Sequence, residues 1–223
     1  MTMNNKTHKL MHDLYGCNIY LDIDMDVYLP DVSGGSDNTI CSMLFELIKP
    51  KTAIEVGSWK GKSAIYFAQL MCEVVNPVVI CVDTWLGSSE HYLSMKNDPV
   101  WGISKYLSHG KSNLYEQFLI NVVHSGYENI IVPIVNTSSV AADILAAHSV
   151  IADFIYIDAN HDEDEVYSDM CKYWELLRYG GVMAGDDFTA SWYGVICAVS
   201  KFAKEYSVPV QVQGNTWFMQ KTS

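Results

Sequence analysis

Carboxylates follow two strand-like segments in the second half of the chain. Asp158 comes directly after residues 153–157, and Asp186 and Asp187 come shortly after residues 181–184. If both segments are parallel strands of one sheet, their carboxyl ends meet at one edge and the three acids face one another. Such a cluster repels itself unless a cation neutralises it, and hard oxygen ligands suit Mg²⁺, Ca²⁺ or Mn²⁺. These residues therefore predict a divalent metal site, with magnesium as the leading candidate.

A histidine, His161, lies three residues beyond the first of these acids. Its unperturbed pKa of about 6.5 suits a base near neutral pH. A metal beside it could bind a substrate hydroxyl, lower the pKa of that hydroxyl and hold its oxygen in place. Each residue alone is more often a helix-capping acid, a solvated turn or a surface histidine, but their joint placement favours a site. Asp158 and His161 are therefore the predicted catalytic residues.

A glycine-rich turn occurs earlier in the chain, where residues 55–63 have the sequence EVGSWKGKS. Glycines between a strand and a helix let the backbone approach a ligand, and the helix N-terminus offers it N–H groups. The turn has neither the GxGxxG order of dinucleotide binders nor the GxxxxGK[ST] order of phosphate loops. Glu55 would repel a pyrophosphate but suits a ligand that bears an amine. Asp83, at the end of the next strand, can accept both hydroxyls of a ribose, so the two features together predict a nucleoside pocket.

Strands and helices must alternate to position these residues, and the hydrophobic pattern predicts that they do. The predicted strands are residues 52–56, 77–82, 130–135, 153–157 and 181–184. The predicted helices are residues 36–48, 63–72, 140–147, 166–177 and 196–204, of which 166–177 should end on the glycines of Tyr179-Gly180-Gly181. Residues 208–212 and 217–220 predict a closing hairpin. The fold class is therefore α/β, a doubly wound sheet with an antiparallel edge.

The pattern E-V-G-S-W-x-G-x-S, the acid after the second strand and the late hairpin resemble class I S-adenosylmethionine-dependent methyltransferases. The resemblance covers about residues 48–220 and implies a Rossmann-like, mostly parallel seven-stranded sheet with an antiparallel C-terminal hairpin. It also implies that S-adenosylmethionine is the cofactor. The cofactor-binding residues that it implies are Glu55, Gly57, Ser58, Trp59, Gly61, Ser63 and Asp83, with Ser138 and Ser139 where this family often contacts adenine.

The second group of residues resembles two kinds of metal-dependent O-methyltransferase, the catechol and caffeoyl-CoA type and the macrolide-sugar type. Both have an acid after strand four, an acid or acid-amide pair after strand five, and a base three residues beyond the first acid. Asp158, Asp186 and Asp187 match the metal ligands and His161 matches the base. The base is lysine in the catechol type and histidine in the sugar type, so the chain is more similar to the latter. The implied acceptor is a small-molecule hydroxyl, on a sugar or a phenol.

Composition limits the partners of the chain. The length of 223 residues predicts a single domain that spans residues 1–223. Within it we expect an N-terminal cap or helical segment at 1–47 and a lid insertion at 84–111. The insertion could equally serve only to cover the hydrophobic core. The net charge of -12, without any Lys/Arg run, argues against nucleic acid and anionic lipid as partners. We expect a cytoplasmic protein, since no segment has the roughly 20 apolar residues of a membrane span. A homo-oligomer stays open.

Three other functions compete with methyl transfer to a small molecule. A metal-dependent hydrolase or hydroxylase could use the same scaffold, but it would not need a nucleoside pocket. A non-catalytic cofactor-binding module would have no use for three facing carboxylates. A nucleic-acid methyltransferase would need a local basic groove, and the sequence has no [ND]PP[YF] turn.

Overall fold

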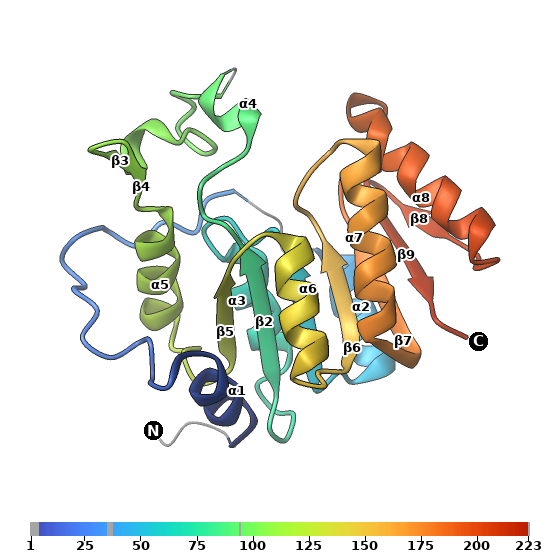
Figure 1. The fold of residues 1–223 in the computed structure, drawn as a ribbon, viewed down its shortest axis with the longest axis horizontal. Coiled ribbons are helices and arrows are strands. Elements are labelled where there is room, and N and C mark those ends of the chain that lie inside the picture. Colours follow the sequence, from blue (N-terminus) through green and yellow to red (C-terminus); the bar gives the residue numbers. More distant parts are fainter. Residues whose placement is uncertain (1–4, 35–37, 94, 223) are drawn as a thin grey trace.

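The computed structural model describes residues 5–34, 38–93 and 95–222, and its centre is one seven-stranded sheet (Figure 1). The strands are β1 Thr52–Val56, β2 Val78–Asp83, β5 Ile131–Val135, β6 Ala152–Ile157, β7 Leu177–Gly185, β8 Gln211–Gln213 and β9 Thr216–Gln220. Their order across the sheet is β5-β2-β1-β6-β7-β9-β8. The first five are parallel, while β9 runs antiparallel to β7 and β8 antiparallel to β9. The predicted fold class is confirmed.

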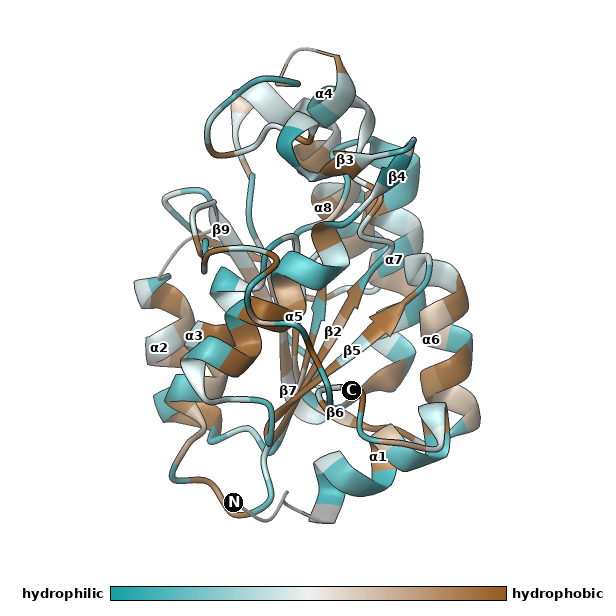
Figure 2. Ribbon diagram, turned by 90° about the vertical axis from the view of Figure 1, so that its left-hand side faces the viewer, coloured by the Kyte–Doolittle hydropathy of each residue, from teal (hydrophilic) through white to brown (hydrophobic). Residues whose placement is uncertain are grey.

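Helices cover both faces of the sheet, which is why the parallel strands are apolar along nearly their whole length. Figure 2 shows α2 and α3 on one side of the strands and α6 and α7 on the other. The helices that connect or flank the strands are α2 Thr39–Ile48, α3 Lys62–Leu70, α5 Leu114–Ser125, α6 Ser138–Ala147, α7 Glu163–Leu176 and α8 Tyr193–Glu205, which follows the short 3-10 turn η2 Ala190–Trp192. Each parallel crossover brings the next strand back in the same direction. The carboxyl ends of the five parallel strands therefore lie at one edge.

The N-terminal segment wraps around this sheet. Helix α1, Asn5–Tyr15, packs against β5, and the hydroxyls of Tyr15 and Tyr20 donate to backbone carbonyls of that strand at 2.7 and 3.1 Å. The predicted helix over 36–48 is α2 from Thr39 onward, and residues 36 and 37 lie outside the described part of the chain. Helix α1 lies within the predicted N-terminal cap or helical segment, whereas helix α5 is not among the predicted elements.

The predicted end of the helix before β7 is wrong. Helix α7 ends at Leu176 rather than at the glycines, and Gly180 and Gly181 lie inside β7. The backbone of Leu177 is already extended and pairs with Ala152, after which the register between β6 and β7 shifts. Gly180, with φ +76°, allows the irregularity that this shift requires. The glycines therefore serve a bulge in the strand and not a helix cap.

The insertion at 84–111 has structure of its own and lies over the carboxyl edge of the sheet, at the top of Figure 1. It contains α4 Ser89–Tyr92, the 3-10 turn η1 Ser104–Tyr106, and most of a small hairpin of β3 Leu107–Ser108 and β4 Lys111–Ser112. Within the described residues, no helix has the length and apolar character needed to span a membrane.

Candidate active site

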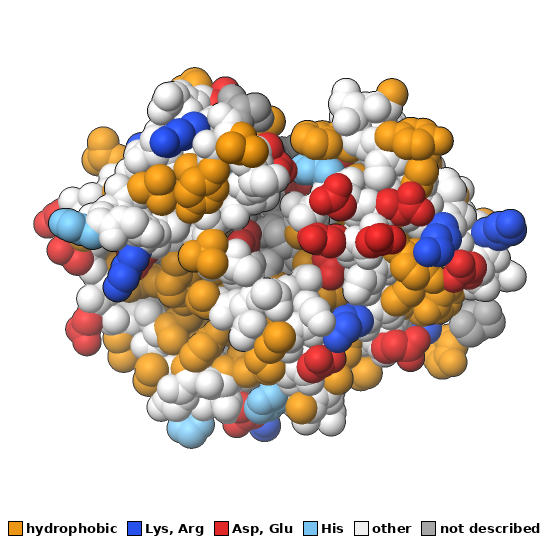
Figure 3. Space-filling model, turned by 45° about the horizontal axis from the view of Figure 1, so that its top comes forward, with side chains coloured by type: hydrophobic (Ala, Val, Ile, Leu, Met, Phe, Trp, Pro, Cys, Tyr) orange, Lys and Arg blue, Asp and Glu red, His pale blue; other side chains and the backbone are white. Residues whose placement is uncertain are grey.

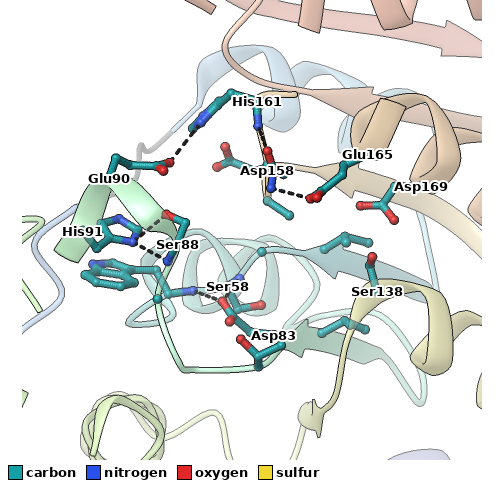
Figure 4. Close-up of a pocket in the computed structure, with 18 of the residues that line it drawn as sticks. Ser58, Asp83, Ser88, Glu90, His91, Ser138, Asp158, His161, Glu165 and Asp169 are labelled. Carbon is teal, nitrogen blue, oxygen red and sulfur yellow. Dashed lines mark hydrogen bonds and ion pairs between the residues drawn. The ribbon is translucent and has the colours of Figure 1, made fainter. Parts of the chain in front are cut away.

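A cavity of about 560 Å³ opens at the carboxyl edge, between the strand ends and the insertion. Its walls come from the turn between β1 and α3, the ends of β2, β5, β6 and β7, helix α7, and the insertion. Figure 4 shows Glu90 close to His161 on one side, Ser138 close to Asp169 on another, and Asp83 near Ser58. Residues of both predicted groups therefore line one continuous space.

The glycine turn is held in place by Asp83. One oxygen of this carboxylate accepts hydrogen bonds from the backbone N–H groups of Ser58 and Trp59, both at 2.9 Å, and the other accepts from Trp85 at 2.7 Å. Burial raises the pKa of Asp83, and these donors act against the rise. Gly57 has φ +89°, and a Cβ there would lie 2.1 Å from the carbonyl oxygen of Asp158. Only glycine therefore fits where the turn passes the end of β6.

Glu55 lies behind the turn and is fully buried, so it does not line the cavity. Burial raises the pKa of this carboxyl to about 7, and the nearby hydroxyls of Ser58 and Ser63 moderate the rise. Neither carboxylate oxygen of Glu55 is close enough and well enough aligned to form a hydrogen bond with the described residues. Gly61, at φ +86°, is the N-cap residue of α3, and a Cβ there would lie 2.9 Å from the ring of Phe118. These two residues shape the turn from behind.

The far end of the cavity is formed where β5 passes into α6. Thr137 caps α6, because its side chain accepts from the N–H of Val140 at 3.4 Å. Ser138 lines the cavity and faces Asp169 of α7, whereas Ser139 does not line it. Burial raises the pKa of Asp169 to about 6, and a hydrogen bond from Ser138 lowers it. Asp169 is 5% exposed and was not predicted as a site residue.

The three predicted metal ligands interact across the strand ends. Burial, with the charges of Asp186 and Asp187, raises the pKa of Asp158 well above its usual range. Asp158 and Asp187 line the main cavity, and Asp186 lines a small adjoining one. Among the described residues, however, no three His, Cys, Asp or Glu side chains converge as ligands of a metal ion. Asp187 is instead paired with His161.

The His161 ring lies between two carboxylates. Its Nε2 is 2.9 Å from an oxygen of Asp187, and its Nδ1 is 3.3 Å from an oxygen of Glu90. The ring also stacks on Trp192, with centroids 3.7 Å apart. Burial alone would lower the pKa of His161, but its hydrogen bond to Asp187 and the charges of both acids raise it above the ordinary value. The ring can therefore hold a proton inside the cavity.

The insertion supplies an aromatic wall. The ring of Trp59 stacks on His91 at 4.2 Å and lies 6.3 Å from Trp101. The indole N–H of Trp85 donates to the carbonyl oxygen of Trp59 at 2.7 Å and so links the start of the insertion to the turn. The prediction of a lid at 84–111 stays a prediction, but the position of the insertion over the site agrees with it.

A polar anchor joins the insertion, the turn and the N-terminal segment. The buried amine of Lys60 lies 3.0 Å from a carboxylate oxygen of Asp31 and donates to the hydroxyl of Ser33 at 2.6 Å and to the carbonyl oxygen of Val100 at 3.2 Å. Lys105, from the insertion, binds the same oxygen of Asp31 at 2.8 Å. Burial would raise the pKa of Asp31, but these donors hold it far below its usual value.

Most predicted site residues line the cavity, although their roles stay predictions. Those that line it are Gly57, Ser58, Trp59, Ser63, Asp83, Ser138, Asp158, His161 and Asp187; those that do not are Glu55, Gly61, Ser139 and Asp186. Sequence reasoning missed Glu90, Asn136, Thr137, Asp169 and Trp192. The density of aromatic residues in the insertion was the available signal for its His91 and Trp101.

Comparison with known proteins gives a consistent result. Among solved structures, the fold is similar to an O-methyltransferase from Bacillus cereus in complex with SAH, at 14% identity and a TM-score of 0.63, covering 100% of this chain and 93% of that one. It is also similar to the O-methyltransferase TomG from Streptomyces achromogenes, involved in tomaymycin synthesis and in complex with SAM, at 13% identity and a TM-score of 0.62, covering 100% and 92%. At such low identity these likenesses show the fold alone. The comparison with curated proteins finds no match.

The sequence itself carries the family assignment. Residues 54–188, more than half of the chain, match the family described as a methyltransferase domain. The matched region begins in β1, contains the glycine turn and Asp83, and ends just after Asp187. It therefore includes both predicted groups of residues. The chain belongs to the methyltransferase domain family.

Proposed function

We propose that this chain transfers a methyl group from S-adenosylmethionine (SAM) to a hydroxyl of a small molecule. Family membership supports methyl transfer, and two proteins of the same fold are O-methyltransferases in complex with SAM or its product SAH. The observation that carries the proposal is the cavity itself, where the glycine turn and Asp83 share one space with Asp158, Asp187 and His161. A hydrolase would not need the first of these groups.

The residues at the turn fit a nucleoside with an amino-acid tail. The indole N–H of Trp59 is buried in the cavity wall and has no hydrogen-bond partner, so a ligand that accepts there would satisfy it. The carboxylate of Asp83 accepts three backbone hydrogen bonds and keeps acceptor capacity for a ribose hydroxyl. We assign Gly57, Ser58 and Ser63 to the same subsite, with Glu55 and Gly61 supporting it from behind. Ser138 and Ser139 stay assigned to the adenine end.

The chemical step needs positioning and one proton acceptor. The bound donor supplies a methyl group already activated on a sulfonium. The cavity walls hold the acceptor hydroxyl in line with that methyl, which accounts for much of the rate. A carbon–oxygen bond forms as the carbon–sulfur bond breaks with its electron pair left on sulfur, and the neutral ring of His161 accepts the hydroxyl proton.

The proposal also includes a divalent cation bound beside the methyl donor. Asp158, Asp186 and Asp187 offer the all-oxygen set that Mg²⁺ prefers, and burial together with the charges of the other two acids raises the pKa of Asp158. One oxygen of Asp187 lies 2.9 Å from the His161 ring, so an ion would be bound by its other oxygen or would displace the ring. Such an ion would lower the pKa of the acceptor hydroxyl.

Labelled SAM tests the reaction class. Purified protein is incubated with methyl-labelled donor and a panel of hydroxylated rings, with Mg²⁺ or with a chelator, and the linkage of the labelled methyl is determined. The proposal predicts label on oxygen, with turnover lost in the chelator and in Asp158→Asn. Label found on nitrogen or carbon would contradict a hydroxyl acceptor, and full activity in the chelator would remove the metal from the proposal.

A further inference from the structure

The charges that line the cavity are almost all of one sign. Six carboxyl groups reach it, and among the described residues that line it none is lysine or arginine. The acids are Asp83, Glu90, Asp158, Glu165, Asp169 and Asp187. Figure 3 shows acidic side chains gathered beside the central hollow. Among these lining residues, no lysine or arginine offers a permanent positive charge to an anion.

The nearest lysines are engaged elsewhere. Lys60 belongs to the glycine turn, but its side chain is fully buried and points to Asp31, Ser33 and the carbonyl of Val100. Lys105 binds the same carboxylate from the insertion. Both amines are therefore held by the polar anchor and do not line the cavity. A phosphate or carboxylate on the acceptor would lose its hydration beside these carboxyl groups without gaining a salt bridge to lysine or arginine.

Aromatic rings complete the acceptor end of the cavity. Trp59 and His91 form one stacked pair, with Trp101 near it, and Trp192 stacks on His161 on the other side. Glu90 lies between the two pairs, bound to His161 and next to His91 in α4. Aromatic faces combined with carboxylates are the surroundings that bind ammonium groups in proteins.

We propose that the acceptor is a hydroxylated ring that carries an amine, and that anionic acceptors such as phosphorylated sugars and coenzyme A thioesters are excluded. This inference rests on the proposed methyl transfer, because it names the substrate class of that same site. The ring stacks against the wall of His91 and Trp101, and the ammonium faces Glu90. Two opposite unit charges a few ångströms apart near a protein surface change affinity by about tenfold or more.

Matched ligands that differ only in charge test the preference. SAH binding is measured first, and the SAH-saturated protein is then titrated calorimetrically with tyramine, tyrosol and 3-(4-hydroxyphenyl)propionate, and with glucosamine, glucose and glucose 6-phosphate. The inference predicts that the amine of at least one series binds about tenfold more tightly than its neutral analogue, and that neither anion binds. It also predicts that the difference shrinks as salt is raised.

Two variants separate the charge effect from a general loss of structure. Glu90→Gln keeps the shape of the side chain and should reduce the preference for the amine several-fold. Glu73→Gln removes an exposed acid that does not line the cavity and should leave the preference unchanged. An anion that binds as tightly as the amine, or no binding by either amine, overturns the inference while the SAH result stands. Loss of SAH binding in the wild-type protein would instead overturn the proposed function.

Discussion

Asp169 is a buried acid in the wall of the cavity, and its ionisation should cost folding free energy. The side chain is 5% exposed, and burial raises its pKa to about 6, from an unfolded value of about 3.9. Because the folded state prefers the protonated form, stability is highest below the unfolded pKa. It falls as the pH rises from about 4 to about 6 and is then constant.

The variant Asp169→Asn removes this cost. The amide can still accept from Ser138 but cannot ionise, so at pH 8 the variant should be more stable than the wild type by about 1 to 3 kcal/mol. At pH 4 the two proteins should have nearly equal stability. Urea unfolding followed by circular dichroism at both pH values measures the difference. A difference that does not change with pH would show that ionisation of Asp169 is not its source.

Among individual site residues, the sequence predicts the acids at strand ends and misses those on helices and in the insertion. Asp83, Asp158 and Asp187 follow recognisable strands, so their shared edge follows from topology. Asp169 lies within the helical pattern of α7, where a single acid among apolar residues resembles a solvated position. Glu90 reaches His161 only through the path of the insertion, which no local pattern specifies.

Among the elements, the turn between β1 and α3 should tolerate the least change. Gly57→Ala places a Cβ 2.1 Å from the carbonyl of Asp158 at a positive φ, and we expect a loss of more than about 4 kcal/mol or no folded protein. Gly126→Ala is the matched control, because Gly126 also has a positive φ, +75°, but open space around it. It should cost about 1 to 2 kcal/mol.

Thermal or urea unfolding of the two alanine variants measures this contrast. If Gly57→Ala lost no more stability than Gly126→Ala, the close approach of the turn to β6 would not exist in solution. SAH binding by a stable Gly57→Ala protein would lead to the same conclusion.

The polar anchor should hold the insertion against the turn. Lys60→Met removes a buried charge that binds Asp31, Ser33 and the backbone at Val100, while Asp31 keeps Lys105. We expect a loss of about 1 to 3 kcal/mol and faster cleavage within 84–111 during limited proteolysis. Lys62→Met, a second lysine change next to the same turn, is the control. Equal cleavage rates in both variants would mean that the anchor does not restrain the insertion.

Most boundaries of the predicted strands lie within one or two residues of those in the structure, whereas helix α5 is missed. The reason is visible in its buried face, where Gln117 and Asn121 interrupt the apolar pattern. Gln117 donates to the carbonyl of Leu29, and Asn121 to those of Asp31 and Lys60. These amides bind the N-terminal segment, a tertiary role that gives no periodic signal. The same limit explains why the N-terminal segment is predicted only as a cap or helical segment, since its contacts are with distant parts of the chain.

The whole molecule should unfold as one unit. Helix α1 and the segment after it bond to β5, and the polar anchor ties that segment to the centre of the sheet. Differential scanning calorimetry should therefore show a single transition over residues 1–223, and SAH should move it to higher temperature by mass action. Two separate transitions would show that the N-terminal segment or the insertion unfolds independently.

Donor binding is the central claim, and calorimetric titration with SAH tests it most directly. Wild-type protein is titrated with and without Mg²⁺, and Asp83→Ala is titrated after circular dichroism confirms that it is folded. We predict one SAH per chain for the wild type, and loss of binding in the variant, because Asp83 both orders the Ser58–Trp59 backbone and lines the cavity. A folded wild-type protein that binds no SAH under either condition would contradict the claim.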